Sequence, residues 1–249
     1  MILLYHHILP EGDAAGFSAE DGLTFRHSPE AFRFHLEELQ RRGYRFGALD
    51  HLVRQLDDGI AEDDRSAFVT FDDGWRNQYE HALPILLALE IPATFFVTTD
   101  HLRQGVSCAK RMGPAELRAL ADAGMTIGSH TRTHPDLAHL DDTRLEDELR
   151  GSRQDLEDLL GRPVTIFAYP GGSLSARVVR AVRRAGYEAA CCSFGPARND
   201  ATSLFWMYRD VISASMRSPR DRYRLSPLAR QLLTFRVERR LRASLHRRA

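Results

Sequence analysis

Two adjacent carboxylates, Asp72 and Asp73, follow the apolar run at 67–71 and precede Gly74. The run is rich in β-branched and aromatic residues, which is typical of a buried strand. Two like charges side by side at a strand end repel each other, so they need a cation or a strong hydrogen-bond donor nearby. The pattern therefore indicates a functional site. The alternative is a polar turn that merely ends a strand.

Two histidines, His130 and His134, follow a second strand-like run at 126–129. Their imidazoles are four residues apart and can face the same way in a helical turn. Two histidines, one carboxylate and an open fourth position form a catalytic zinc site, whereas structural zinc sites are closed and usually contain Cys. The histidine spacing alone is weak because surface histidines often share it. Combined with Asp72 and Asp73, it predicts a catalytic zinc site.

A third candidate lies at Tyr169-Pro170-Gly171-Gly172, directly after the apolar run at 164–168. Glycine lets the backbone approach a ligand closely, and backbone N–H groups form many oxyanion holes. The Gly171 amide is therefore a candidate donor to an oxyanion. A Pro-Gly turn without chemistry is the alternative reading of the same residues.

Strand-like and helix-like segments alternate along the chain. Seven strands are predicted, at 2–5, 67–71, 93–97, 126–129, 164–168, 188–192 and 206–212. Helices are predicted at 29–42, 49–56, 79–87, 114–123, 141–160 and 175–185. This alternation implies a parallel sheet.

The candidate residues share one position relative to these strands. Each follows the C-terminal end of a strand: His6, Asp72, Asp73, His130 and Pro170. In a barrel of parallel strands those ends lie on one face, where active sites are found. The fold prediction and the site prediction therefore support each other.

Composition bounds the class of protein. A chain of 249 residues with 43% hydrophobic residues and a formal net charge of +0 is long enough for one large core and suits a single α/β domain. Cys108, Cys191 and Cys192 form no disulfide framework, and the adjacent pair is expected to pack as small hydrophobic residues. No segment approaches the roughly 20 apolar residues of a membrane span.

Localisation is predicted from the first residues, which do not resemble an export signal. As the sequence stands, we expect a cytoplasmic or inner-membrane-associated protein. If the natural start lies upstream, a periplasmic or cell-surface location is expected instead.

The last part of the chain is strongly basic. Between residues 217 and 249 there are 11 arginines and only two acidic residues, and apolar residues recur among them. We place a domain boundary after residue 215 and expect a helical extension at 216–249. It could lie on an anionic membrane or against an acidic partner, or pack on the domain with a solvated basic face. No nucleic acid is expected, because no recognition motif accompanies the charge.

Three stretches carry a family resemblance. Residues 70–74 (TFDDG), 129–134 (SHTRTH) and 167–172 (FAYPGG) resemble the first, second and third motifs of the polysaccharide deacetylase family, the NodB-homology or carbohydrate esterase family 4 domain. The similarity runs from about residue 4 to 212. The family's fold is a distorted (β/α)7 barrel, which agrees with the predicted alternation.

The resemblance implies roles for several residues. Asp73, His130 and His134 would bind the metal, and Asp72 would be the catalytic base. The motif order is closest to that of poly-N-acetylglucosamine deacetylases, where a Tyr-His pair near the N-terminus supplies the catalytic acid. His6 matches that histidine, and residues 213–242 contain no other histidine for the task. The alternative is that His6 is an ordinary loop residue.

Departures from the family pattern concern the surroundings of the metal. Ala168 stands where many members have an arginine that tunes the base, and Arg209 on the last strand is a candidate substitute, although a surface salt bridge would use it as readily. Trp206 is the candidate for the tryptophan that lines the sugar site. Tyr169 and Pro170 are expected to contact the substrate.

The sequence thus predicts a zinc-dependent hydrolase, with Co²⁺ or Ni²⁺ as other suitable ions, that removes N-acetyl groups from an N-acetylhexosamine of a glycan or glycan precursor. Two alternatives belong to other classes. One is a catalytically weak glycan-binding domain of the same fold. The other is a membrane-associated assembly protein that uses the basic C-terminal segment.

Overall fold

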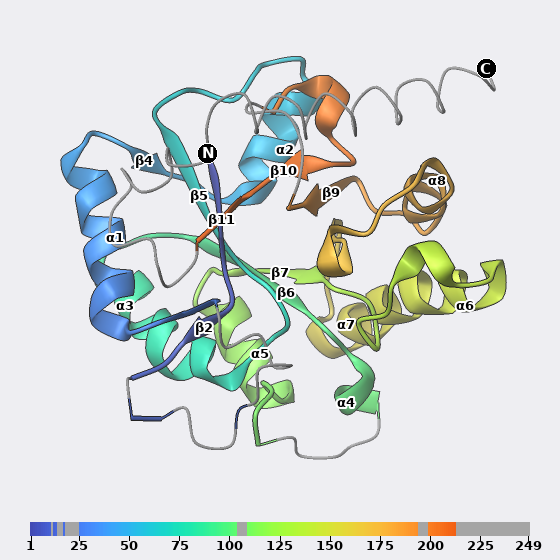
Figure 1. Cartoon of the computed structure of the whole chain (residues 1–249), viewed down its shortest axis with the longest axis horizontal. Helices are drawn as coiled ribbons and strands as arrows, with labels where there is room; N and C mark the ends of the chain where they lie inside the picture. The colour runs from blue at the N-terminus through green and yellow to red at the C-terminus, as the bar shows by residue number, and fades with distance from the viewer. Residues whose placement is uncertain (11, 14–16, 18–24, 104–108, 194–198, 213–249) are drawn as a thin grey trace.

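The computed structural model describes residues 1–10, 12–13, 17, 25–103, 109–193 and 199–212 (Figure 1). The basic segment at 216–249 and Cys108 lie outside the described residues. The domain boundary predicted after residue 215 therefore stays a prediction.

The strands form two parallel sheets. They are β1 (Ile2–Tyr5), β2 (His7–Ile8), β3 (Arg26–His27), β4 (Arg45–Phe46), β5 (Ser66–Phe71), β6 (Ala93–Val97), β7 (Thr126–Ser129), β8 (Ile166–Ala168), β9 (Ala189–Cys192), β10 (Met207–Tyr208) and β11 (Asp210–Val211). The main sheet has the order β10-β9-β8-β7-β6-β5-β1-β11, with β4 paired to the start of β5, while β2 and β3 pair with each other.

The two ends of this order are halves of one segment. β10 pairs with β9, β11 pairs with β1, and only Arg209 separates β10 from β11. The predicted strand at 206–212 is thus split into two short strands that bridge both edges of the sheet. Counted as one segment, it closes a seven-stranded parallel barrel, so the predicted (β/α)7 fold is confirmed.

The helices lie between the strands in sequence and carry the remaining apolar surface. They are α1 (Pro29–Arg41), α2 (Leu49–Asp57), α3 (Leu83–Ala88), α4 (Asp100–Arg103), α5 (Pro114–Asp122), α6 (Asp142–Glu146), α7 (Ser152–Leu160) and α8 (Ala176–Arg184). Short turns are the π-helical η3 (Gln78–Ala82) and η5 (Asp147–Gly151), and the 3₁₀-helical η4 (Leu137–His139), η6 (Pro170–Gly172) and η7 (Ala201–Ser203). The helices predicted at 79–87 and 141–160 therefore each contain a π turn.

The inside of the barrel is filled by side chains from several strands. Phe68 of β5, Phe96 of β6 and Ile166 of β8 belong to one buried cluster, together with leucines of α2. This contact places α2 over the end of the barrel where the strands begin. Gly128 is required opposite Phe96, because a Cβ there would lie 2.5 Å from its ring.

Every second side chain of β5 points into the barrel, from the start of the strand to its end. Because successive side chains of a strand point to opposite faces, Thr70 and Asp72 share the face of Phe68. Thr70 and Asp72 therefore lie near the C-terminal ends of the strands, whereas the apolar cluster around Phe68 fills the barrel below them.

Other sequence expectations are met by the described residues. Cys191 and Cys192 are both buried, and burial raises the pKa of the Cys191 thiol to about 12. None of the helices that the structure describes is long and apolar enough to cross a membrane.

Candidate active site

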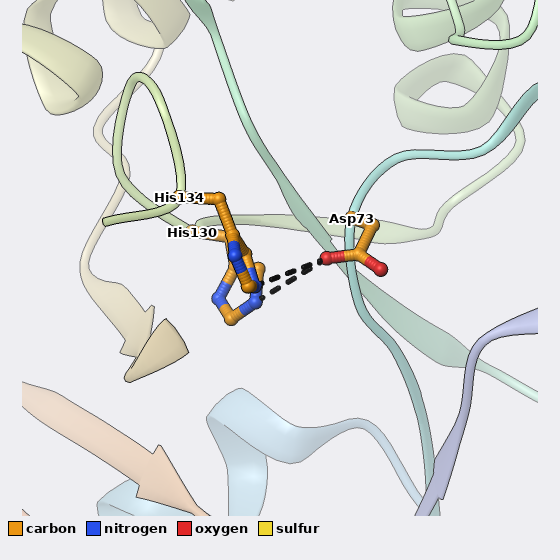
Figure 2. A group of neighbouring side chains, drawn as sticks. All are labelled: Asp73, His130 and His134. Carbon is orange, nitrogen blue, oxygen red and sulfur yellow. Dashed lines mark ion pairs between the residues drawn. The ribbon is translucent and has the colours of Figure 1, made fainter. Parts of the chain in front are cut away.

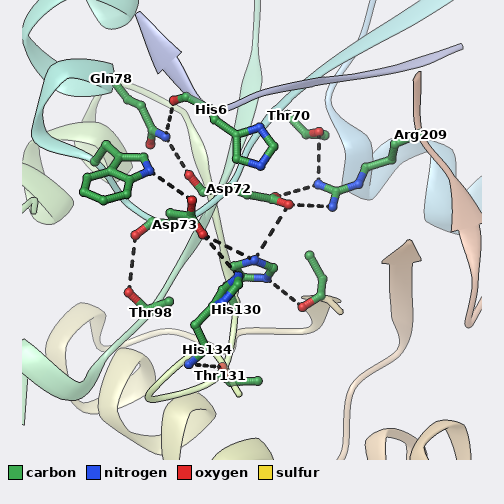
Figure 3. A network of polar contacts seen from close by, with 12 residues as sticks. His6, Thr70, Asp72, Asp73, Gln78, Thr98, His130, Thr131, His134 and Arg209 are labelled. Atoms are coloured by element: carbon green, nitrogen blue, oxygen red, sulfur yellow. Dashed lines mark hydrogen bonds and ion pairs between the residues drawn. The ribbon is translucent and has the colours of Figure 1, made fainter. Parts of the chain in front are cut away.

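Polar side chains from the ends of three strands meet at one end of the barrel. Asp72 and Asp73 follow β5, His130 follows β7, and His6 follows β1 (Figure 3). The predicted gathering of these residues on one face is therefore what the fold produces. The β5 end also bends sharply, because Asp73 adopts a left-handed backbone conformation (φ 75°) and so turns its side chain away from that of Asp72.

Three side-chain atoms that could bind a metal ion lie close together beside the buried Asp72. The Asp73 Oδ1 atom lies 3.6 Å from His130 Nε2 and 3.5 Å from His134 Nε2 (Figure 2). One ligand atom from each of the three residues lies within 4.8 Å of the others. For a tetrahedral ion with bonds of about 2.0–2.1 Å, ligand atoms are separated by about 3.4 Å. The spacing of this group therefore fits a zinc-sized ion.

The hydrogen bonding of His130 adds a second test of that fit. His130 Nδ1 lies 2.8 Å from the carbonyl oxygen of Ala168, and a carbonyl only accepts, so Nδ1 carries the proton. Burial lowers the pKa of His130 to about 4, so the ring is neutral at neutral pH. Its Nε2 lone pair then faces the Asp73 carboxylate directly. Two facing electron-rich atoms are stable when a cation lies between them, which is the chemistry of a metal site.

Asp72 is held by Arg209. The guanidinium donates from Nη1 to Oδ1 at 2.6 Å and from Nη2 to Oδ2 at 2.7 Å, and both side chains are buried. Burial raises the pKa of the Asp72 carboxyl, but the charge of Arg209 and the hydrogen bonds that Arg209 donates outweigh burial and hold that pKa well below its usual range. Asp72 is therefore a carboxylate at neutral pH.

His6 lies beside Asp72, across the site from His130 (Figure 3). His6 is one of the neighbours that lower the pKa of Asp72 and of Asp73. Burial, the largest single influence, acts in the opposite direction, but the pKa of each carboxyl is lowered overall. The His6 ring stacks on Phe25 with centroids 5.0 Å apart. The buried His6 Nδ1 atom has no hydrogen-bond partner among the described residues.

The adjacent His7 has a different environment. It is buried, its Nδ1 lies 3.0 Å from the Asn77 amide nitrogen, and its ring packs on Trp75. It is a core residue beneath the site.

Asp73 has supports that the sequence did not indicate. The Trp75 indole N–H donates to Asp73 Oδ2 at 2.9 Å, which leaves Oδ1 directed at the histidines. Arg111 donates to the Asp73 carbonyl, and its guanidinium lies 3.5 Å above the Trp75 ring. The Thr98 hydroxyl donates to the same carbonyl at 3.3 Å. These contacts hold the left-handed backbone of Asp73 in place.

Gln78 links two of the candidate strands. Its side-chain amide donates to the carbonyl of His6 at 2.8 Å and to the carbonyl of Asp72 at 2.6 Å. It thereby fixes the end of β1 against the end of β5. No sequence signal marked this residue, because both partners come from the folded arrangement.

The third motif contributes backbone more than side chains. Gly171 is exposed and left-handed (φ 58°), which glycine accommodates without strain. The amides of the two following residues close the turn by donating to the carbonyls of Tyr169 and Pro170. Gly171 itself lies at the surface of the turn.

The aromatic residues expected to contact substrate are packed inside the protein. Tyr169 is 1% exposed, and its hydroxyl donates to the Phe205 carbonyl at 2.9 Å. Trp206 is 8% exposed and belongs to the hydrophobic core. The structure therefore gives both side chains a packing role, and Pro170 is buried beside them.

Comparison with known proteins identifies the family. A profile described as polysaccharide deacetylase matches residues 59–190, which is more than half of the chain. The chain belongs to the polysaccharide deacetylase family. The match spans β5 to β9, the part of this deacetylase that carries Asp72, Asp73, His130 and His134.

Individual relatives and structures agree with this assignment. Bacillus subtilis YxkH is 22% identical over 215 residues, covering 86% of this chain and 72% of that protein. Three further curated relatives are spanned over only 31% to 45% of their length.

Two solved structures show that the fold is shared. The Streptococcus pyogenes deacetylase PplD has a TM-score of 0.75 at 24% identity, over 88% of this chain and 94% of that one. IcaB from Ammonifex degensii has a TM-score of 0.72 at 21% identity, over 92% and 96%.

Proposed function

We propose that this polysaccharide deacetylase is a metal-dependent hydrolase that removes N-acetyl groups from N-acetylhexosamine residues of a glycan. One observation carries the proposal: the donor atoms of Asp73, His130 and His134 converge at 3.5 and 3.6 Å beside the buried carboxylate of Asp72. A metal site next to an ionised carboxylate suits the hydrolysis of an unactivated amide.

The metal would be held by Asp73, His130 and His134, with zinc the ion that best suits two imidazoles and one carboxylate, and Co²⁺ or Ni²⁺ suited to the same ligands. When bound, such an ion polarises the acetyl carbonyl and lowers the pKa of a water molecule toward about 7. The remaining steps belong to side chains and backbone of this chain.

Asp72 would accept the proton of the attacking water, while Arg209 holds Asp72 ionised and fixes its orientation. The Gly171 N–H would donate to the oxyanion that forms from the acetyl carbonyl. His6 would donate a proton to the leaving amine. Its position beside Asp72 supports that role, as does its Nδ1 atom, which has no hydrogen-bond partner in the part of the chain that the structure describes.

The substrate class is supported by the names of relatives. A chitooligosaccharide deacetylase of Rhizobium leguminosarum is 28% identical over 140 residues, covering 56% of this chain and 61% of that protein. A peptidoglycan-N-acetylmuramic acid deacetylase of Bacillus subtilis is 28% identical over 127 residues. Both names describe sugars that carry an N-acetyl group on a hexosamine ring.

The Asp72–Arg209 pair favours an active enzyme over a catalytically weak glycan-binding domain. The sequence raised that alternative because Ala168 stands where many relatives have a base-tuning arginine. Arg209 reaches the same carboxylate from the other end of the chain. Membrane association through the basic segment at 216–249 is a separate proposal, testable by liposome sedimentation of the full chain and of a chain ending near residue 215.

The test is acetate release from N-acetylglucosamine oligomers, measured together with bound metal. We expect His130→Ala and His134→Ala to lose metal and activity together, because each removes one of three protein ligands. The exposed His139, which forms an ion pair with Asp136, provides the matched control: His139→Ala keeps both. Full zinc stoichiometry in either ligand variant would overturn the proposed site.

A further inference from the structure

The segment that carries the two histidines is held in an unfavourable backbone conformation. Thr131 and His134 both adopt left-handed φ values, 68° and 60°. A residue other than glycine is strained in this conformation and keeps it only when the surrounding structure holds it there. The segment from His130 to His134, here the histidine loop, therefore needs strong external contacts.

Those contacts converge on one buried carboxylate, Glu148. Its Oε2 atom accepts the backbone N–H of Arg132 at 2.8 Å and that of Thr133 at 3.0 Å. Its Oε1 atom accepts the Thr133 hydroxyl at 2.6 Å. All three donors belong to residues between the two histidines. Hydrogen bonds to an ionised acceptor are the strong ones, and Glu148 is only 5% exposed.

The helix under the loop is shaped to present this carboxylate. Glu148 lies in η5, the π turn between α6 and α7. The neighbouring Ser152 hydroxyl donates to the Glu148 carbonyl at 2.6 Å and lies 2.8 Å from the hydroxyl of Ser129, the last residue of β7. The widened turn is therefore tied to the strand from which the histidine loop departs.

The loop also grips the same helix through Arg132. Its guanidinium donates from Nε and Nη2 to the two carboxylate oxygens of Asp155 at 3.0 and 3.1 Å and also pairs with Asp147. Gly151 makes room for it, because a Cβ there would lie 2.1 Å from the Arg132 Cζ atom. These bonds are made by a side chain that leaves the loop, whereas Glu148 fixes the loop backbone itself.

His134 depends on this arrangement more than His130 does. The His130 ring is buried and anchored to the Ala168 carbonyl, whereas the His134 side chain is 44% exposed. The His134 backbone N–H donates to the Thr131 hydroxyl at 3.0 Å. The direction of its ring is therefore set by the path of the loop, which Glu148 fixes one and two residues earlier.

We propose that Glu148 is a positioning residue of the metal site, which presets the backbone of the histidine loop so that His134 meets Asp73 and His130 without further ordering. The inference rests on the proposed metal site. It adds a residue with no ligand atom of its own and no contact with substrate. Removing it should weaken metal binding while the folded barrel persists.

The experiment measures zinc affinity of the full chain by competition with a chromophoric chelator. We expect Glu148→Ala to weaken zinc binding by about 10- to 100-fold, the effect typical of lost outer-shell partners. Glu148→Gln should bind close to wild type, because its amide oxygen can accept the two N–H groups and its NH₂ can donate to the Thr133 hydroxyl. Glu146→Ala on the same helical stretch is the control: its exposed pair with Arg150 lies away from the loop, and its zinc affinity should be unchanged.

The outcomes separate the two proposals. Wild-type zinc affinity in folded Glu148→Ala would overturn this inference alone, whereas absence of zinc binding in the wild-type chain would overturn the proposed function with it. If Glu148→Ala does not fold, Thr133→Val decides, because it removes one bond to Glu148 and should weaken zinc binding about fivefold. Unchanged affinity in Thr133→Val would then refute the role.

Discussion

Arg209 forms a bidentate ion pair with Asp72, and it is itself the residue that separates β10 from β11. The backbone on either side of Arg209 pairs with β9 and with β1, where the barrel closes. The closure of the sheet therefore brings the guanidinium under the carboxylate of β5. In this chain the residue that keeps the proposed base ionised therefore lies where the barrel closes.

The first prediction concerns the stability of this pair. We expect Arg209→Met to lower the free energy of unfolding by about 3–5 kcal/mol, because it leaves the buried carboxylate of Asp72 uncompensated. The double variant Asp72→Asn/Arg209→Met should recover part of that loss. Urea unfolding followed by circular dichroism measures both, with an unchanged m-value as the sign that the folded state is the same.

A surface pair provides the control for that experiment. Arg54→Met breaks the exposed pair of Arg54 with Asp50, and surface pairs contribute about 0–1 kcal/mol. Equal stability of Arg209→Met and Arg54→Met would show that the buried pair does not have the energetic role described.

The second prediction separates the two adjacent aspartates. Asp73→Asn should lose bound metal, because Asp73 Oδ1 faces both histidines. Asp72→Asn should keep the metal while the rate of acetate release falls by a factor of order 10² or more, because a base is lost and not a ligand. Metal content by atomic absorption and turnover are measured on the same samples. Retention of metal by Asp73→Asn with its loss from Asp72→Asn would mean that the two roles are reversed.

Much of this fold was predictable because its strands are short apolar runs. The runs predicted at 2–5, 93–97 and 126–129 coincide with β1, β6 and β7. The split of the last strand was not predictable, because Arg209 looks like an ordinary polar residue in a strand until the sheet closes. The π turn that presents Glu148 was also hidden, since its sequence continues the helical periodicity.

Some residues of the candidate site could likewise be predicted from the sequence, and others could not. Asp72, Asp73, His130 and His134 were visible because short motifs place them, whereas Trp75, Gln78 and Glu148 act through contacts that only the fold creates. Gln78 bonds to a carbonyl 72 residues away. Tyr169 and Trp206 show the opposite case. Tyr169 was expected to contact sugar because it lies in the third motif, and Trp206 because it could replace the family's tryptophan, but both side chains pack in the core.

The third prediction is a pH effect on stability through His27. Its Nε2 lies 3.1 Å from the Ile212 carbonyl oxygen, and burial lowers its pKa from 6.5 to about 4. Between these values the unfolded chain binds a proton that the folded chain does not. Stability therefore falls as the pH is lowered from about 6.5 to 4, and His27 contributes up to about 3 kcal/mol of that loss.

His27→Gln tests this directly, because its amide can still donate to the Ile212 carbonyl but does not titrate. The variant should show a shallower decrease in unfolding free energy over that pH range than the wild type. Both proteins are measured with chelator present, so that metal binding does not affect their stability. His130 has a similarly lowered pKa, but it contributes equally to both proteins. Parallel pH dependences would mean that His27 is not the titrating group.

The last prediction concerns the proton donor. We expect His6→Ala to keep its metal and its fold but to lose most acetate release, because the leaving amine would lack its proton source. A general acid must hold its proton before the transfer, so activity of the wild type falls at alkaline pH as the acid is deprotonated. That alkaline limb of the kcat profile should disappear in His6→Ala. His51→Ala, on the exposed face of α2, is the matched control and should leave the profile unchanged. His7→Ala is unsuitable as a control because His7 packs on Trp75 in the core. Near-normal turnover by metal-loaded His6→Ala, with the alkaline limb intact, would assign the acid to another residue.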